Sequence, residues 1–533
     1  MTIITNRIQE RNNKVLDILK NFGNASLRII AQLAGLSKDA VNRALKSLER
    51  RNVYPESPLW ETEIGQVWLC RLLIAVMLEF GIKGGVGAER ISAFFRLIHL
   101  EKNLAISPNV LRILARKLEN LVIEYGKLQE ESQAGTEREI VAAGDETFFK
   151  DRILLIAMDL GSGYLLMEED AQDRTFETWS EKLKNRLEQM GCKVRHFISD
   201  RAKALIKLAV EGLHCNSGAD LFHAQQEITR WLGMGFRTKL ASIKKEIQRL
   251  QDQLQAQGVS ALEIVQQLLA VAKEKQKRFE EGKEKYGSLL RGISKILHPF
   301  TMTGVQKTTS GVVEEMQEQA QALSMLGEEY DISDPQGRLG KFTRQIKNLA
   351  NTIDAWWLWV EESIKNLDPS LKPGMEKYRW AIEILLPKVY WEMQVTRTDT
   401  VELRDVYRIT AQNAVTVWQS HPLTKSLSEV EIQRFHLWAE WMCRQFQRSS
   451  SAVEGRNGCL SQRYHNGRGL SARSLKALTV IHNFDTHQSD GTTPAERLFG
   501  TQFPNLFEWI LGEIDQLPSP RSSKSLNLQV VAA

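Results

Sequence analysis

Apolar residues recur at helical spacing in the N-terminal part of the chain and predict three helices, at 13–22, 26–34 and 38–51. The turn Gly35-Leu36-Ser37 separates the last two, and Ser37 is a residue type that commonly begins a helix. The apolar stripe of the last helix consists of Val41, Leu45 and Leu48. The residues outside this stripe are polar or basic: Lys38, Asn42, Arg43, Lys46 and Arg50. This helix-turn-helix pattern predicts a DNA-binding unit whose second helix enters the major groove; plain packing of two helices is the alternative.

A second helical pattern follows, with helices predicted at 89–98 and 108–125. Pro108 after Ser107 is the expected start of the later helix, because proline fits the first helical turn. We therefore expect a DNA-binding region over residues 1–130, with two units at 13–51 and 88–126. The second unit could read a further stretch of one DNA end, or it could be a packing spacer.

The pattern becomes strand-like after a polar linker at 130–138. Strands are predicted at 140–146, 152–159 and 163–168, then a helix at 176–190, a strand at 193–199, a helix at 202–211 and a short strand at 220–222. Three strands followed by helix, strand, helix and strand is the order of the RNase H-like fold, in which the first and fourth strands lie side by side. We expect residues 137–224 to form the first part of such a core.

Helical periodicity dominates from 225 to 440, where no further strand pattern occurs. We expect an all-helical insertion at 225–440, the second part of the core with a catalytic helix at 441–500, and a C-terminal tail at 501–533. The predicted fold class is multidomain: an all-α helix-turn-helix N-terminal region, and an α/β RNase H-like catalytic core interrupted by a large all-α insertion.

The charge of the chain is concentrated locally. Its 533 residues carry a formal net charge of only +5, with 42% hydrophobic and 25% charged residues, as in ordinary globular proteins. Residues 1–51 have a local net charge of +6, and so do residues 441–484, where Glu454 is the only acid. Two basic segments at opposite ends of the sequence suggest two contacts with one polyanion. A chance excess of solvated charges is the alternative.

The cysteines and the apolar runs indicate a cytoplasmic protein. Five scattered cysteines without a C-x-x-C pair favour a reducing compartment and argue against a disulfide framework. The N-terminal sequence lacks the apolar segment of a signal peptide. The most apolar run, 68–82, is broken by Arg71 and Glu79, so no membrane insertion is expected.

Two acids end apolar runs that are predicted as buried strands: Asp145 on the first strand and Asp200 on the fourth. With Glu454, they provide three hard oxygen ligands, which can hold a pair of magnesium ions against phosphate oxygens. Glu146 would point to the opposite face of the strand from Asp145. Asp159 is an alternative to Asp145, although an acid before a glycine turn more often serves that turn.

Three short motifs resemble those of the DDE transposases of bacterial insertion sequences: Gly144-Asp145-Glu146-Thr147, Ile198-Ser199-Asp200-Arg201, and Ser451-Ala452-Val453-Glu454-Gly455-Arg456-Asn457. Members of this family often have an N-terminal helix-turn-helix region and, in several branches, a helical insertion between the second and third acids. The tyrosine and arginine that precede the glutamate in one branch, and the lysine seven residues after it, are missing here.

The resemblance implies that Asp145, Asp200 and Glu454 are the catalytic, metal-binding triad, with two Mg²⁺ ions for which Mn²⁺ substitutes. It implies double-stranded DNA as the partner, both the terminal inverted repeats of the element and the target. It also implies a homodimer or larger assembly on DNA, with nucleoid association of a cytoplasmic protein.

Further residues are expected to contact DNA or the reacting phosphate. The DNA backbone is the expected partner of the basic residues that follow the second and third acids: Arg201, Lys203, Arg456, Arg463 and Arg468. Ion pairs with strand acids are the alternative. His223 could contact the phosphate or be structural, and Asn457 shares a polar helix face with Glu454. The aromatic group of the insertion is expected to be core rather than a base-stacking site: Trp356, Trp357, Trp359, Trp380, Tyr390 and Trp391.

The sequence thus favours a transposase that binds element ends, cleaves DNA and joins strands by a two-metal mechanism. Two alternatives stay open. One is a structure-selective nuclease of the same fold, and the other is a DNA-binding regulator derived from a transposase with an inactive site.

Overall fold

The computed structural model describes residues 7–53, 57–60, 62–101, 103–150, 152–256, 262–514 and 518. The chain forms two compact units, which are described separately. Unit 1 combines Met1–Gln133 with Leu460–Ala533, and unit 2 is Ala134–Cys459. The protein is therefore a multidomain, α-rich chain with one α/β region.

Unit 1 begins with the three predicted helices, α1 (Arg7–Phe22), α2 (Leu27–Ala34) and α3 (Lys38–Val53). Gly35 ends α2 in the left-handed region, with φ of 64°, which glycine adopts without strain. The Ser37 hydroxyl accepts a 3.1 Å hydrogen bond from the Ala40 N–H, as expected of a residue that begins α3. The small core between these helices contains Val15, Ile30, Ala31, Val41, Ala44, Leu45 and Leu48. The predicted apolar stripe of α3 is thus buried.

The rest of unit 1 is helical as well. Its N-terminal part contains α4 (Ser57–Trp60), α5 (Glu63–Val76), the π-helical segment η1 (Met77–Lys83), α6 (Ala88–Leu97) and α7 (Pro108–Glu131). Its C-terminal part contains η6 (Tyr464–Arg468), α21 (Ala472–Phe484), α22 (Pro494–Phe499) and α23 (Leu506–Gly512). Helices α21 and α23 pack on α7, and Gly126 lies so close to Val480 that an added Cβ would approach the valine side chain within 2.6 Å.

The two units do not coincide with two of the predicted segments. Residues from Leu460 onward fall in unit 1, whereas the predicted second part of the core is 441–500, and the predicted tail at 501–533 includes α23. These segments fall in unit 1 because α7 packs against α21 and α23. Helix α7 itself continues to Glu131, into the predicted linker.

One helical stretch of the described residues, Glu63–Lys83, is long and apolar enough to cross a membrane. A single such helix is weak evidence for a membrane span, because core helices of water-soluble proteins have the same length and composition.

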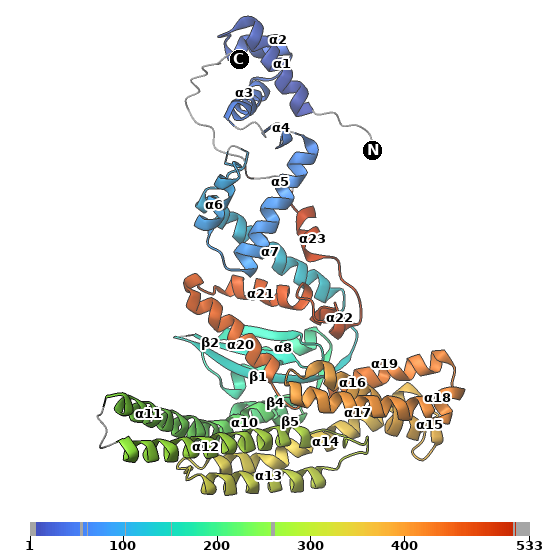
Figure 1. Ribbon diagram of the computed structural model, residues 1–533. Helices are drawn as coiled ribbons and strands as arrows, with labels where there is room; N and C mark the ends of the chain where they lie inside the picture. Colours follow the sequence, from blue (N-terminus) through green and yellow to red (C-terminus); the bar gives the residue numbers. More distant parts are fainter. Residues whose placement is uncertain are drawn as a thin grey trace. The chain divides into compact units, whose positions relative to one another are not determined.

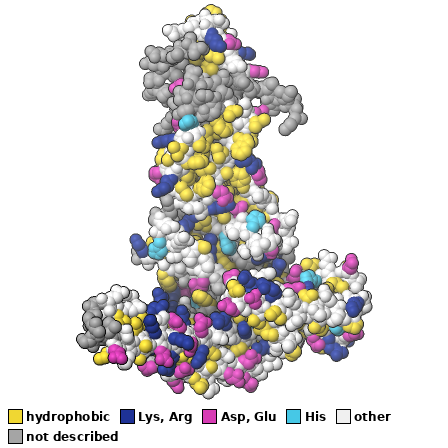
Figure 2. Space-filling view, in the orientation of Figure 1, with side chains coloured by type: hydrophobic (Ala, Val, Ile, Leu, Met, Phe, Trp, Pro, Cys, Tyr) yellow, Lys and Arg dark blue, Asp and Glu magenta, His cyan; other side chains and the backbone are white. Residues whose placement is uncertain are grey.

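Two basic residues of this stretch form ion pairs. Arg71 forms an ion pair of 2.8 Å with Glu508, and Lys83 pairs with Asp485. Figure 2 shows hydrophobic side chains at the surface over α5 and α7, where Ile64 and Trp68 are exposed.

Unit 2 is built on a five-stranded mixed sheet with the order β3-β2-β1-β4-β5. The strands are β1 (Arg138–Phe149), β2 (Arg152–Asp159), β3 (Leu165–Ala171), β4 (Cys192–Ser199) and β5 (Asn216–Ala219). The first three form an antiparallel meander, whereas β4 pairs in parallel with both β1 and β5. Strands β1 and β4 are therefore neighbours, as the predicted topology required.

The last strand differs from its predicted position at 220–222. It ends at Ala219, and Asp220 begins helix α10 (Leu221–Ile228) instead. The reason is local, because Oδ1 of Asp220 accepts a hydrogen bond of 2.8 Å from the Phe222 N–H and so fixes a helical turn.

Helix α8 (Phe176–Gln189) packs against β3 and β4 on one face of the sheet (Figure 1). On this face Gly144 of β1 lies under Phe197 and Trp179, and a Cβ at Gly144 would approach the Phe197 ring within 2.6 Å. The connection between β4 and β5 is α9 (Lys203–Lys207) followed by η2 (Leu208–Gly212). Because side chains alternate along a strand, Asp145 points to the opposite face of the sheet.

The insertion is helical apart from a single bridge between Phe300 and Gln306 in the described residues. Its first group of helices packs side by side (Figure 1): η3 (Thr229–Gly233), α11 (Met234–Ala256), α12 (Leu262–Ile296), α13 (Thr309–Glu329) and α14 (Arg338–Leu367). Its second group comprises α15 (Glu376–Arg379), η5 (Trp380–Leu385), α16 (Leu386–Arg397), α17 (Val401–Ser420), α18 (Pro422–Ser426) and α19 (Glu429–Gln445). The aromatic group is core, as predicted: Trp356, Trp359, Trp380, Tyr390 and Trp391 are buried, and Trp357 is half-buried.

Candidate active site

The candidate site lies on the face of the sheet opposite α8. The strand register places Asp145 of β1 beside Ile156 of β2, and Ile156 beside Glu168 of β3. Side chains that pair in this way across neighbouring strands point to the same face. Two acids, Asp145 and Glu168, therefore share one row of the sheet, separated by an apolar residue.

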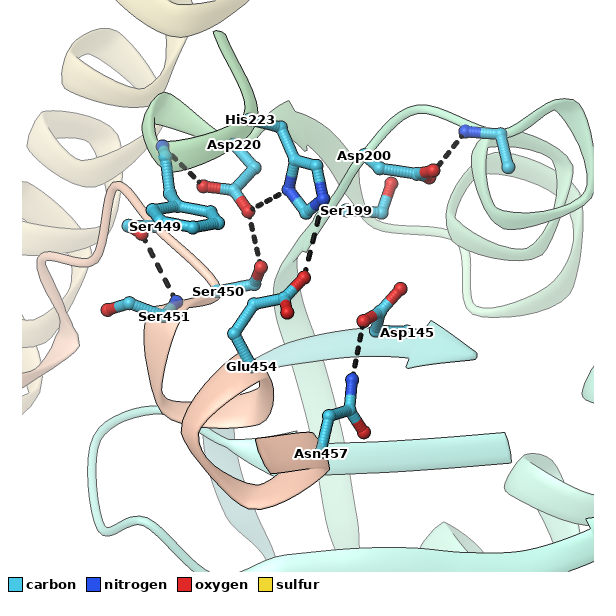
Figure 3. Close-up of polar contacts among 12 residues, drawn as sticks. Asp145, Ser199, Asp200, Asp220, His223, Ser449, Ser450, Ser451, Glu454 and Asn457 are labelled. Atoms are coloured by element: carbon cyan, nitrogen blue, oxygen red, sulfur yellow. Dashed lines mark hydrogen bonds and ion pairs between the residues drawn. The ribbon is translucent and has the colours of Figure 1, made fainter. Parts of the chain in front are cut away.

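Helix α20 (Ser451–Arg463) binds both acids of this row through consecutive residues. The Arg456 guanidinium forms two hydrogen bonds of 2.7 Å with the carboxylate of Glu168. Nδ2 of Asn457 donates a hydrogen bond of 2.7 Å to Oδ2 of Asp145. Glu454, three residues before Asn457, lies one turn earlier on the same helix face. The helix thus carries the Glu454 side chain toward Asp145 (Figure 3).

A second set of polar contacts reaches Glu454 from helix α10. Nε2 of His223 lies 3.4 Å from Oε1 of Glu454, and its Nδ1 lies 2.7 Å from Oδ2 of Asp220. The Ser450 hydroxyl donates a hydrogen bond to the same oxygen of Asp220. Figure 3 shows the resulting chain of groups, from Ser450 through Asp220 and His223 to Glu454. Asp220 is buried, with 1% of its surface exposed, so these bonds replace water around its carboxylate.

The electrostatics of this cluster follow from burial and from the crowding of acids. Burial and the negative charge of Glu454 raise the pKa of Asp145 to about 7. The hydrogen bond with Asp220 raises the pKa of His223, and the charges of Glu454 and Asp145 act in the same direction. Burial alone would raise the pKa of Asp220, but hydrogen bonds from His223 and Ser450 outweigh it and lower that pKa. A protonated His223 can then donate from both ring nitrogens, to Asp220 and to Glu454.

Asp200, the third predicted acid, lies near this cluster but is turned away from it. The last residue pair between β1 and β4 is Ala143 with Ile198. Asp145 and Asp200 each lie two residues beyond this pair. The Asp200 carboxylate accepts a hydrogen bond of 2.8 Å from the Ala202 N–H (Figure 3). Within the described part of the chain, no group of three or more His, Cys, Asp and Glu residues is close enough to hold a metal ion. The structure therefore brings together Asp145 and Glu454, but not all three acids.

The two alternative acids have other surroundings. Asp159 accepts hydrogen bonds from the Gly161 and Ser162 N–H groups, which is the turn role that its position before a glycine favours. Burial, and next the negative charge of Asp200, raise the pKa of Glu146. Its Oε1 is buried and has no hydrogen-bond partner in the described structure. Sequence reasoning did not anticipate this link between Glu146 and Asp200.

The basic residues predicted to contact DNA differ in their freedom to do so. Arg456 follows the alternative that the sequence left open: it forms an ion pair with the strand acid Glu168, and only 11% of its side chain is exposed. Arg463 donates to the backbone oxygen of Lys83, and Arg201 donates to that of Ser217. Lys38, Arg43 and Lys203 are exposed, and Asn42 and Lys46 are half-buried. The side chains of Arg50 and Arg468 lie outside the described residues.

Two residues that the structure places in the site were not expected there from the sequence: Glu168 and Asp220. Asp220 and His223 are three residues apart at a helix start, and this spacing is the one local signal that identifies Asp220. Glu168 is 288 residues from Arg456 in the sequence, so no local pattern connects them.

Comparison with known proteins gives one partial match. Residues 382–526 match a family of unknown function (DUF6399). This stretch runs from η5 through Glu454 and Asn457 into unit 1. A comparison with curated proteins finds no match. The family carries no assigned activity, so the function must be argued from the site.

Proposed function

We propose that the protein is a DNA transposase whose unit 2 is an RNase H-like catalytic core with a helical insertion. One observation carries the proposal. Asp145 of β1 and Glu454, 309 positions apart in the sequence, face one another, and Asn457 and His223 contact one acid each. The strand order β3-β2-β1-β4-β5, with β1 and β4 parallel, supports the core assignment.

The residues of the site fit a divalent cation. Asp145 and Glu454 offer hard oxygen ligands of the type that Mg²⁺ prefers. The pKa of Asp145 is raised by burial and by the charge of Glu454, which means that the two carboxylates repel each other, and a cation between them would relieve this repulsion. We propose that both acids hold Mg²⁺, or Mn²⁺ in its place, and that Asp200 joins them by giving up its bond with Ala202. When bound, the metal activates the attacking oxygen and stabilises the leaving oxygen of the phosphodiester.

The other residues of the site would orient these acids and the DNA. Asn457 fixes the rotamer of Asp145, and Asp220 holds His223 with its second nitrogen toward Glu454. A protonated His223 would also attract a phosphate oxygen. Helix α3 would supply the sequence-specific contact, with Arg43 exposed on its polar face. Joining two element ends would require two or more copies of the chain, acting on the nucleoid in the cytoplasm.

The test is incubation of the purified protein with Mg²⁺ and a labelled DNA that carries the flanking ends of its own gene. We expect cleavage and strand joining by the wild type and neither reaction by Glu454→Gln. The control Glu263→Gln changes an exposed acid of α12 and should retain both reactions. Cleavage without joining would indicate a structure-selective nuclease. Specific binding without cleavage would indicate a regulator with an inactive site, an outcome that the orientation of Asp200 favours as the second candidate.

Asp200 is tested separately, because its role requires a change of rotamer. Asp200→Asn keeps an oxygen that can accept from the Ala202 N–H but removes the charge that a metal needs. We expect this variant to bind DNA as the wild type does and to lose cleavage. Full cleavage by Asp200→Asn would exclude Asp200 as a metal ligand.

A further inference from the structure

The segment between α19 and α20, residues 446–450, is bound to the helical insertion through Arg448. Its Nη1 donates hydrogen bonds of 2.6 Å to the Ser294 carbonyl and 3.0 Å to the Leu297 carbonyl. These carbonyls lie at the C-terminal end of α12, a helix that runs from Leu262 to Ile296. The free carbonyls at a helix C-terminus carry partial negative charge, so a guanidinium is stabilised there without a carboxylate partner.

His298 completes the binding site for the guanidinium. Nη1 of Arg448 lies 3.0 Å from Nε2 of His298, and Nδ1 of the same ring lies 2.5 Å from the Tyr390 hydroxyl. Complete burial, together with the charges of Arg448 and Lys307, keeps the pKa of His298 well below its usual value. The ring is therefore neutral, with Nδ1–H donating to Tyr390 and Nε2 accepting. Nε2 also lies 2.9 Å from the Tyr407 hydroxyl, so Arg448 and this tyrosine share one acceptor.

The backbone and neighbours of Arg448 reach the candidate active site. Its carbonyl oxygen accepts a hydrogen bond of 2.9 Å from the Leu221 N–H, at the start of α10. Two residues later, Ser450 binds Asp220, the partner of His223. The Ser450 carbonyl also accepts from the Glu454 N–H at 3.2 Å, in the first turn of α20. The segment that carries Arg448 thus contacts the first turns of both α10 and α20.

We infer that Arg448 is a positioning residue through which the end of α12 sets the places of His223 and Glu454. The insertion then has a role in the site that does not require it to touch DNA: it holds the segment that aligns the two helices. Assays of metal binding and of DNA cleavage are informative only if the proposed function is right. The alignment of α10 and α20 by Arg448 does not rest on the proposed function, and it can be measured in the absence of metal and DNA.

The experiment compares Arg448→Met with a matched control at the same helix end. Nζ of Lys307 donates to the Ile296 carbonyl and to the carboxylate of Glu315, and neither partner belongs to the segment 446–450. Lys307→Met therefore also removes a cation from the end of α12, without changing the aligning segment. Arg448→Lys is the rescue variant, because a lysine can still bind one carbonyl. His298→Asn is a milder variant that removes the Nε2 acceptor and leaves both carbonyls in place.

Hydrogen exchange is the first measurement. In Arg448→Met we expect faster amide exchange at Leu221 and over 449–457, whereas Lys307→Met should leave both at the wild-type rate. The second measurement is Mn²⁺ binding, for which we expect a Kd raised roughly 10- to 100-fold by Arg448→Met. In the cleavage assay kcat should fall by up to about 100-fold with KM for DNA little changed. Arg448→Lys and His298→Asn should fall between wild type and Arg448→Met in each measurement.

The inference is overturned if Arg448→Met exchanges as the wild type does at Leu221 and 449–457. It is equally overturned if Lys307→Met changes these amides as much, because Arg448 would then only stabilise the insertion. If Arg448→Met does not fold, His298→Asn decides by the same exchange criterion. A wild type that cleaves no DNA would refute the proposed function, and the exchange result would still decide the role of Arg448.

Discussion

Arg456 and Glu168 form a two-point ion pair, with both N···O distances at 2.7 Å, in the row of the sheet that also contains Asp145. The pair fixes the rotation of α20 about its axis, because the next residue, Asn457, then faces Asp145. The side chain of Glu168 is fully buried, and Arg456 places a cation beside its carboxylate. The pair is therefore part of the scaffold that holds Glu454 in place.

Removing one partner of this pair should be costly. We expect Arg456→Met to lower the free energy of unfolding by about 3–5 kcal/mol, because it removes a bidentate cation from a buried carboxylate. Urea unfolding of unit 2 by circular dichroism measures the change. Most of this loss in the free energy of unfolding should disappear in the double variant, which combines Arg456→Met with Glu168→Met. An equal loss in the single and double variants would show that packing, and not charge, connects the two residues.

Asn457→Ala should separate catalysis from DNA binding. The variant removes the hydrogen bond that orients Asp145, and loss of such a partner typically lowers metal affinity or activity about 10- to 100-fold. DNA binding, measured by fluorescence anisotropy without metal, should stay at the wild-type level. Gln462→Ala, a change on the same helix away from Asp145, is the control. Wild-type cleavage by Asn457→Ala would mean that Asp145 needs no orientation from α20.

If helix α3 contacts DNA as proposed, the contact should appear in the salt dependence of binding. We expect Arg43→Ala with Lys46→Ala to weaken binding to the element ends and to reduce the slope of log K against log[salt] by about 1 for each phosphate that is no longer neutralised. Lys20→Ala, at the end of α1, changes a basic residue outside this helix. Titrations between low and physiological salt measure the slopes. If all variants keep the wild-type slope, the protein binds the phosphates through other residues.

Acid should destabilise unit 2 through His196, which lies in β4 with both ring nitrogens buried and unbonded in the described structure. Burial lowers the pKa of His196 from 6.5 to about 4. The unfolded chain therefore takes up this proton first, so stability falls as the pH drops from about 6.5 to about 4, by on the order of 3 kcal/mol at the lower end. Burial also lowers the pKa of His298, so its protonation likewise reduces stability as the pH falls.

His196→Leu tests this assignment by urea unfolding at pH 7 and at pH 4.5. The variant should lose less stability between these two pH values than the wild type, because the leucine takes up no proton. The loss of stability that His298 causes between these pH values should remain. The same pH dependence in both proteins would assign the acid destabilisation to other groups.

The sequence predicted those features that have a local cause. Strand β2 occupies the predicted range of 152–159, and α3 buries the predicted stripe, because alternation and helical periodicity are properties of short segments. The extended prediction for 220–222 was wrong because the apolar residues beside Asp220 resemble a strand, whereas its side chain caps a helix.

The features that could not be predicted depend on distant partners. Whether Arg456 faces DNA or Glu168 depends on a strand that folds far from it in sequence. The boundary between the two units lies inside α20. Helical periodicity could not predict it, because the helix continues through it. The proximity of Asp145 and Glu454 was expected from their shared ligand chemistry and from the resemblance of three motifs, because nothing near either residue encodes the other.

The length of the insertion has a consequence for the synthesis of the protein. Asp200 and Glu454 are 254 positions apart, and the segment that aligns Glu454 binds the end of α12 and the start of α10. At translation rates of about 5–20 residues per second, Glu454 is added roughly 10 to 50 s after Asp200. During this interval the nascent chain already carries the helix-turn-helix segment, but it lacks one of the two facing acids. Under the proposed function, a ribosome-bound chain therefore reaches DNA before its catalytic site is complete.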